Sequence, residues 1–73
     1  MLEKPSGIAI DRSNRIVAVA DWRGDKVVLY SYYDGKTIAS TNGFKCPHSI
    51  ALNSNRKLLV TDCWNNRLKV FSY

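Results

Sequence analysis

Short apolar runs alternate with pairs of turn residues along the whole chain. The runs are rich in β-branched residues and none shows the 3.6-residue period of a helix. The pairs include Gly24-Asp25, Asp34-Gly35 and Asn42-Gly43, which favour hairpins. The pattern predicts an all-β antiparallel meander of about seven strands. They are expected at residues 7–11, 15–20, 26–32, 36–41, 48–53, 56–61 and 67–73.

The second half of the chain repeats the first. Residues 5–11 align with residues 47–53 at an offset of 42. The offset falls to 41 from Ser13 onward, because Arg12 is an extra turn residue in the first copy. A period of about 40 residues is typical of propellers and solenoids. We therefore predict one complete blade of four strands and one incomplete blade of three, at residues 1–43 and 44–73.

The first two strands of each copy are apolar on both faces, as residues 8–10 and 16–20 show. Such strands are typical of sheets covered on both sides. The third strand alternates more, with Lys69 and Ser72 between apolar residues. We expect the inner strands to be sandwiched between blades, and two blades to leave two apolar faces uncovered. Such a chain is expected to self-associate or to depend on neighbouring blades.

Composition and charge limit the function classes. The chain has 73 residues, of which 45% are apolar and 23% charged, as in a small folded domain. No apolar run approaches the roughly 20 residues of a membrane span, so no membrane association is predicted. The net charge of +5 favours acidic partners such as nucleic acid. The basic residues are spread along the chain, so a solvated basic surface is the alternative.

Residues 5–11, 15–21 and 59–71 resemble the NHL repeat. The most specific part is the segment Asp-x-x-Asn-x-Arg that begins at Asp62. The first copy departs from it, with Gly24 and Lys26 in place of the Asn and Arg. The resemblance implies blades of a β-propeller that has about six in the complete ring.

The resemblance also implies a function. NHL propellers are frequent in tripartite-motif proteins, where a RING zinc domain gives ubiquitin-ligase activity and the propeller binds RNA or protein targets. This implies a cytoplasmic, non-catalytic binding module without a cofactor, with ligase activity in another domain of a parent protein. Two alternatives stay open: a fragment of a lyase-type propeller with a channel metal, and a purely structural propeller that docks proteins.

One edge of the predicted sheets gathers basic and aromatic residues. In a hairpin register, the loops after the second strands lie beside the residues that precede the first strands. Basic groups bind phosphates and aromatic rings stack on unpaired bases, so we predict a partner-binding edge. The alternative is that the tryptophans fill gaps between blades. The residues of this edge are Lys4, Trp22, Arg23, Lys26, Phe44, Lys45, His48, Trp64 and Arg67.

Asp21 and Asp62 end the second strand of each copy. A metal or ligand site usually uses one copy, whereas a scaffold uses both. We therefore expect these carboxylates to accept hydrogen bonds from turn amides, and to pair with Lys26 or Arg67. The opposite edge is basic as well, which argues against a single dedicated patch. Its cations are Arg12, Arg15, Arg56 and Lys57.

The two cysteines, Cys46 and Cys63, have two interpretations. A two-residue turn at residues 54–55 makes paired positions sum to 109, which places the cysteines opposite each other in a possible cross-strand disulfide. The first copy has Lys4 and Trp22 at these positions, so the fold does not require the bridge, and free thiols suit an intracellular family.

No catalytic or metal motif is recognised. Cys46, His48 and Cys63 do not have the spacing of a zinc site and lack a fourth ligand. The single histidine and the absence of a nucleophile or phosphate-loop motif predict no catalytic residue, metal or cofactor.

Overall fold

The computed structural model describes residues 2–53, 55–62 and 67–73. The predicted all-β fold of seven antiparallel strands is confirmed. No helix that could cross a membrane is present among the described residues. The strands are β1 (Pro5–Asp11), β2 (Ile16–Asp21), β3 (Lys26–Ser31), β4 (Thr37–Thr41), β5 (Pro47–Leu52), β6 (Lys57–Asp62) and β7 (Arg67–Ser72).

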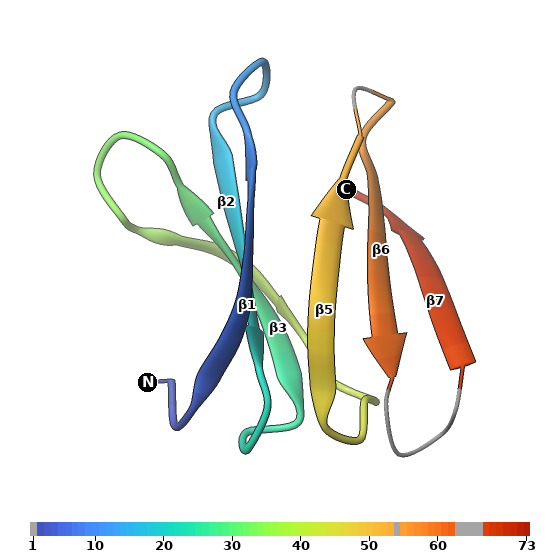
Figure 1. Cartoon of the computed structure of the whole chain (residues 1–73). Coiled ribbons are helices and arrows are strands. Elements are labelled where there is room, and N and C mark those ends of the chain that lie inside the picture. Colours follow the sequence, from blue (N-terminus) through green and yellow to red (C-terminus); the bar gives the residue numbers. More distant parts are fainter. Residues whose placement is uncertain (1, 54, 63–66) are drawn as a thin grey trace.

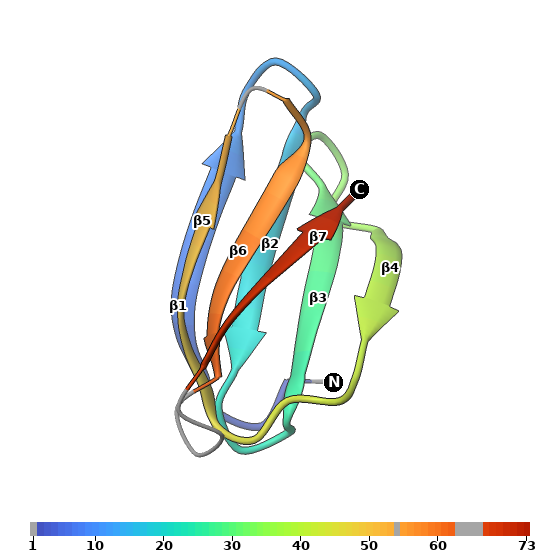
Figure 2. The same ribbon diagram turned by 90° about the vertical axis from the view of Figure 1, so that its right-hand side faces the viewer.

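The strands form two sheets in sequence order. The first sheet is β1-β2-β3-β4 and the second is β5-β6-β7 (Figure 1). The sheets stand face to face, with β1 and β2 against β5, as the view turned by 90° also shows (Figure 2). This arrangement follows from the sequence because hairpin turns join neighbouring strands and both sheets bury an apolar face.

Both first hairpins contain a bulge at the same place. Pro47 lies opposite Asp62, but Leu52 pairs with Leu58, so the register shifts between Pro47 and Ile50. The residue numbers of paired positions near the turn therefore add up to 110 and not to the 109 that a two-residue turn requires. The predicted two-residue turn at residues 54–55 is wrong. The bulge inserts one extra residue into β5, so that Pro47 lies opposite Asp62, as the predicted register has it. The β1–β2 pair has the equivalent shift.

The core lies between the two sheets. Its residues alternate along β2, β3 and β6, because successive side chains of a strand point to opposite faces. Phe44 is 2% exposed, and its ring meets that of Phe71 edge to face at 5.5 Å. The placement of Phe44 on the partner-binding edge is therefore wrong. Burial of the large apolar ring between the sheets stabilises the fold more than its exposure at the edge would. The core residues are Ile16, Ala18, Ala20, Val27, Leu29, Phe44, Leu58 and Val60.

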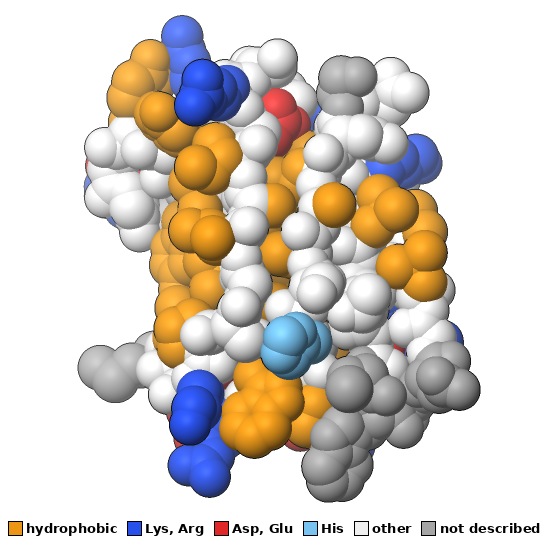
Figure 3. Space-filling model, viewed as in Figure 1, with side chains coloured by type: hydrophobic (Ala, Val, Ile, Leu, Met, Phe, Trp, Pro, Cys, Tyr) orange, Lys and Arg blue, Asp and Glu red, His pale blue; other side chains and the backbone are white. Residues whose placement is uncertain are grey.

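Each sheet keeps one face open. The expectation that two blades leave two apolar faces uncovered is confirmed: on β1, Ile8 is 66% and Ile10 51% exposed. The reason is that each sheet has one neighbouring sheet and not two. Leu68 and Val70, each 58% exposed, lie on the open face of the second sheet. Figure 3 shows hydrophobic side chains in a column along the β1 side of the molecule.

Candidate functional site

Asp21 ties the segment before β1 to the turn after β2. Its side chain is completely buried and accepts amide hydrogen bonds from Glu3 (3.0 Å), Lys4 (2.8 Å) and Gly24 (3.2 Å). Burial raises the pKa of this carboxyl, but the amide donors and the charge of Lys26 outweigh burial and hold the pKa below its ordinary value. Asp21 therefore acts as a fixed acceptor that shapes this end of the sheet.

Asp62 has the same place in the second sheet. It is completely buried, accepts the Lys45 amide at 2.6 Å and pairs with Nε of Arg67 at 3.0 Å. Lys45 aligns with Glu3 in the repeat, so both copies use one carboxylate to hold the segment that precedes the first strand. Arg67, which we predicted on the partner-binding edge, thus has an ion pair within its own sheet.

An open hollow lies at the same end of the molecule, at the seam between the sheets. Its volume is about 320 Å³, and Lys4, Pro5, Ser6, Trp22 and His48 line it. Lys4 Nζ lies 5.8 Å from the centre of the Trp22 ring. Figure 3 shows the histidine at the lower end of the seam, beside hydrophobic and basic side chains. The structure therefore brings together three residues of the predicted edge from both copies of the repeat.

Two further cations of the predicted edge are exposed but do not line this hollow. Arg23 is exposed in the turn after β2. Lys45 is exposed, and its Nζ lies 3.9 Å from the half-exposed carboxylate of Asp25. Two predicted residues of this region, Trp64 and Cys63, lie outside the described residues, so the pairing of Cys63 with Cys46 stays a prediction.

Two arginines of the opposite edge contact protein groups. The Arg15 guanidinium lies over the Tyr33 ring at 4.8 Å, and that of Arg56 over the Tyr73 ring at 5.3 Å. Arg56 also donates to the Tyr73 carbonyl at 2.6 Å and to Oδ1 of Asn14 at 2.9 Å. Arg56 therefore links the two sheets, and Arg15 contacts the turn between β3 and β4.

A hydrogen bond that the sequence analysis missed joins the two sheets at this opposite edge. The hydroxyl of Tyr73 donates to Oδ2 of Asp11 at 2.5 Å, and Asn14 donates to the same carboxylate. Burial and this bond raise the pKa of Tyr73 to about 12. The bond from Tyr73 lowers the pKa of Asp11. The Ser-Tyr pair at residues 31–32 is repeated at residues 72–73, and this repetition was the sequence feature that could have indicated a structural role for Tyr73.

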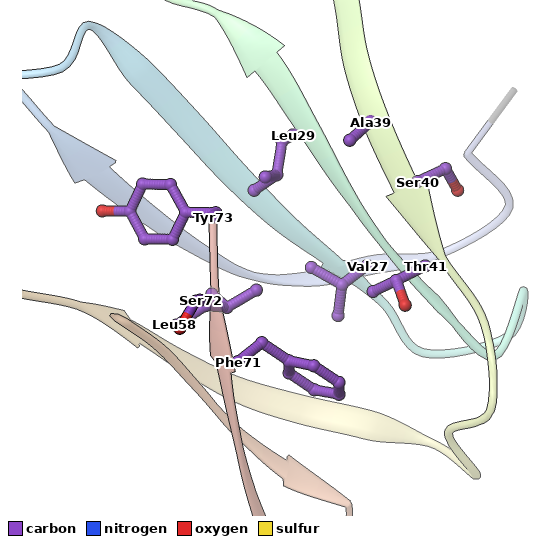
Figure 4. A pocket seen from close by; sticks show the side chains of 9 residues that line it. All are labelled: Val27, Leu29, Ala39, Ser40, Thr41, Leu58, Phe71, Ser72 and Tyr73. Atoms are coloured by element: carbon purple, nitrogen blue, oxygen red, sulfur yellow. The ribbon is translucent and has the colours of Figure 1, made fainter. Parts of the chain in front are cut away.

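A second hollow, of about 190 Å³, lies between β3 and β4 of the first sheet and β6 and β7 of the second (Figure 4). Its lining is mostly apolar, so it offers few groups for chemistry. Across the described residues, no three His, Cys, Asp or Glu side chains gather as a metal site. The lining residues are Val27, Leu29, Ala39, Ser40, Thr41, Leu58, Phe71, Ser72 and Tyr73.

Residues 44–71 match the family model described as the NHL repeat. The chain carries an NHL repeat. The match covers the loop before β5 and the three strands of the second sheet. The first sheet shares its strand order, its bulge and its buried aspartate with this NHL repeat.

Two curated relatives are similar to most of the NHL-repeat chain. They are the E3 ubiquitin-protein ligase TRIM32 of Homo sapiens and that of Mus musculus, each 31% identical over 68 residues. The matches cover 93% of this chain and 10% of each relative, so the chain spans about a tenth of the length of the curated relatives it matches. The NHL repeat and the two sheets support a binding module of the propeller type.

Proposed function

We propose that the edge formed by Lys4, Trp22, Arg23, Lys45 and His48, here named the basic edge, binds single-stranded RNA. The observation that carries the proposal is the open hollow in which Lys4, Trp22 and His48 meet. An unpaired base stacks on the Trp22 ring, and the cations of this edge contact phosphates. Base stacking on an aromatic ring contributes about 1–3 kcal/mol per base.

The cations of the basic edge are available for phosphates. Lys45 has a surface ion pair at 3.9 Å with Asp25, and such exposed pairs contribute about 0–1 kcal/mol. Exchange of that carboxylate for a phosphate therefore costs little. Lys4 lies over the Trp22 ring, so a base that stacks there displaces the ammonium group toward the backbone of the RNA.

The opposite edge is a poor alternative for RNA. Arg15 and Arg56 stack on tyrosine rings, and Arg56 donates two further hydrogen bonds within the chain. Binding of a phosphate to Arg15 or Arg56 would break contacts that stabilise the fold. The proposal therefore assigns RNA binding to one edge, although both edges are basic.

The relatives are named as ubiquitin ligases, which suggests a wider role. In a parent ligase, this chain would select the target while another domain transfers ubiquitin. The target bound by the basic edge would then be an RNA or a protein that is carried with the RNA.

Fluorescence anisotropy with a labelled oligouridine tests RNA binding by the chain. We expect the dissociation constant to rise steeply with salt, because bound phosphates release counterions. Trp22→Ala is expected to weaken binding about 5- to 150-fold, and Trp22→Phe less, since it keeps a stacking ring.

Arg12→Ala is the matched control, because Arg12 is an exposed cation of the opposite edge. Equal losses for Arg12→Ala and Arg23→Ala would contradict a dedicated edge. Absence of oligouridine binding at low salt, or tighter binding of a polyglutamate peptide, would contradict RNA recognition and indicate a protein partner.

A further inference from the structure

The interface between the two sheets uses a different face of each sheet. The first sheet contributes the face that carries Ala18, Val27 and Leu29, named face 1. The second contributes the face that carries Leu58 and Phe71, named face 2. Because the sheets are copies of one repeat, each of them has both a face 1 and a face 2.

Face 2 of the first sheet is open. It carries Val17, Val19 and Tyr30, which align with the buried or half-buried face 2 residues of the second sheet. Val19 is only 8% exposed and Val17 and Tyr30 are half-buried, so the exposed part of this face lies on β1. It also carries Ile8 and Ile10, both more than half exposed. The open surface therefore has the apolar side chains of a face that is buried elsewhere in the same molecule.

Face 1 of the second sheet is open as well. Ala51, Leu59, Leu68 and Val70 lie on it, and they align with face 1 residues that are covered in the first sheet. The two open faces thus have the same kinds of side chain as the two faces that pack against each other. Contiguous exposed apolar faces of this kind mark association sites.

A hollow marks where a neighbour would fill face 2. Its volume is about 420 Å³, and Leu2, Ile8 and Val19 are among its lining residues. Leu2 aligns with Phe44, which is 2% exposed because it lies between the two sheets. Leu2 therefore stands where the repeat places a residue that is buried by the next sheet.

The polar contacts between the sheets also have counterparts at the open faces. Tyr73 of the second sheet donates to Asp11 of the first. By the repeat, Tyr32 is the counterpart of Tyr73, and Asn53 is that of Asp11. The Tyr32 side chain is half exposed and lies at the end of the open face 2.

We propose that copies of this chain associate head to tail, with face 2 of the first sheet of one copy against face 1 of the second sheet of the next. The Asn53 side-chain amide of one copy donates to the Tyr32 hydroxyl of the other, at the place that the bond from Tyr73 to Asp11 has within a copy, because Asn53 Oδ1 already accepts two backbone amides. Contacts between two unlike faces continue from copy to copy and close into a ring when the rotation permits. This association is independent of RNA binding.

Sedimentation velocity of the full chain over a concentration series tests the proposal. Ile8→Asp places a charge on the open face 2, and Val70→Asp places one on the open face 1. We expect the unmodified chain to associate and each variant alone to remain a monomer. A mixture of the two variants is expected to form a 1:1 dimer, because each variant keeps the face that the other has lost.

This mixing result separates unlike from like faces. If face 2 met face 2, Val70→Asp alone would still dimerise, and that outcome overturns the proposal. A chain that is monomeric or unfolded at every concentration overturns it too. Asn42→Asp is the control, since it adds the same charge at an exposed position outside the strands, and it is expected to leave association unchanged.

Tyr32→Phe tests the specific contact if the aspartate variants fail to fold, as circular dichroism would show. It removes one hydroxyl and leaves the ring. We expect the dissociation constant for self-association to rise about two- to tenfold. An unchanged constant would overturn the contact between Tyr32 and Asn53.

Discussion

The Tyr73 hydroxyl donates a hydrogen bond to the carboxylate of Asp11, so a residue that follows β7 is tied to the end of β1 in the other sheet. Asn14 and Arg56 extend this contact: Asn14 donates to Asp11 and accepts from Arg56, and Arg56 lies over the Tyr73 ring. The contact closes one end of the interface between the sheets. The buried Phe44 ring lies in the core of the same interface.

Tyr73→Phe is expected to lower the melting temperature of the chain by about 4–8 °C. The substitution keeps the ring but leaves the buried Asp11 carboxylate without its donor from the second sheet. Thermal unfolding followed by circular dichroism measures the change. Tyr33→Phe is the control, because Tyr33 contacts Arg15 through its ring and is exposed. Equal melting temperatures for both variants would contradict a structural role for the Tyr73 hydroxyl.

Stability at high pH is expected to depend on Tyr73. Its pKa is raised from 10.0 to about 12 in the folded chain. The hydroxyl therefore contributes fully below pH 10, and its contribution is lost as the pH rises through about 12. Urea unfolding from pH 9 upward, with tyrosinate absorbance read in parallel, measures this loss. Tyr73→Phe should show a smaller decrease over the same interval.

Asp21→Asn is expected to destabilise the chain by about 1–3 kcal/mol at neutral pH, because an amide accepts fewer of the three backbone donors. The pKa of Asp21 is lowered, so its contribution is present above the ordinary value of 3.8 and is lost as the pH falls through the folded value. Urea unfolding at pH 7 and pH 3 should give a difference that shrinks in acid. Asp34→Asn, at an exposed turn, should have little effect at either pH.

Phe44→Ala is expected to cost about 3–5 kcal/mol, as for other buried aromatic residues, and to leave little folded protein. Phe44→Leu introduces the residue that the first copy has at this position, and we expect a smaller loss. Denaturant unfolding measures both. A Phe44→Leu chain with native stability but weaker oligouridine binding would show that Phe44 contacts the partner after all.

Arg23→Ala is expected to change RNA affinity, whereas Arg56→Ala is expected to change stability. Arg23 is exposed at the basic edge, so its loss should weaken RNA binding and reduce the salt slope by about 1, without a change in melting temperature. Arg56 holds Tyr73 and Asn14, so its loss should lower the melting temperature and leave the affinity of the folded chain unchanged. Anisotropy and thermal unfolding of both variants check the contrast.

The order of the strands, their approximate bounds and the division into two sheets follow from the sequence. Turn pairs such as Asp34-Gly35 and the apolar runs between them act locally, over a few residues, so a single sequence shows them. The repeat also predicted the structural role of Asp21 and Asp62, because a residue that appears in both copies indicates a shared scaffold role.

The tertiary structure alone decided which side chains meet. Phe44 and Trp22 are both aromatic residues near one edge, yet Phe44 is buried between the sheets and Trp22 lines an open hollow. The repeat marks Tyr73, but its bond to Asp11 in the other sheet was likewise outside the reach of the pattern. The physical reason is that these features depend on how one sheet lies on another. That packing brings together residues far apart in the chain, whereas periodicity reports only the alternation within each strand.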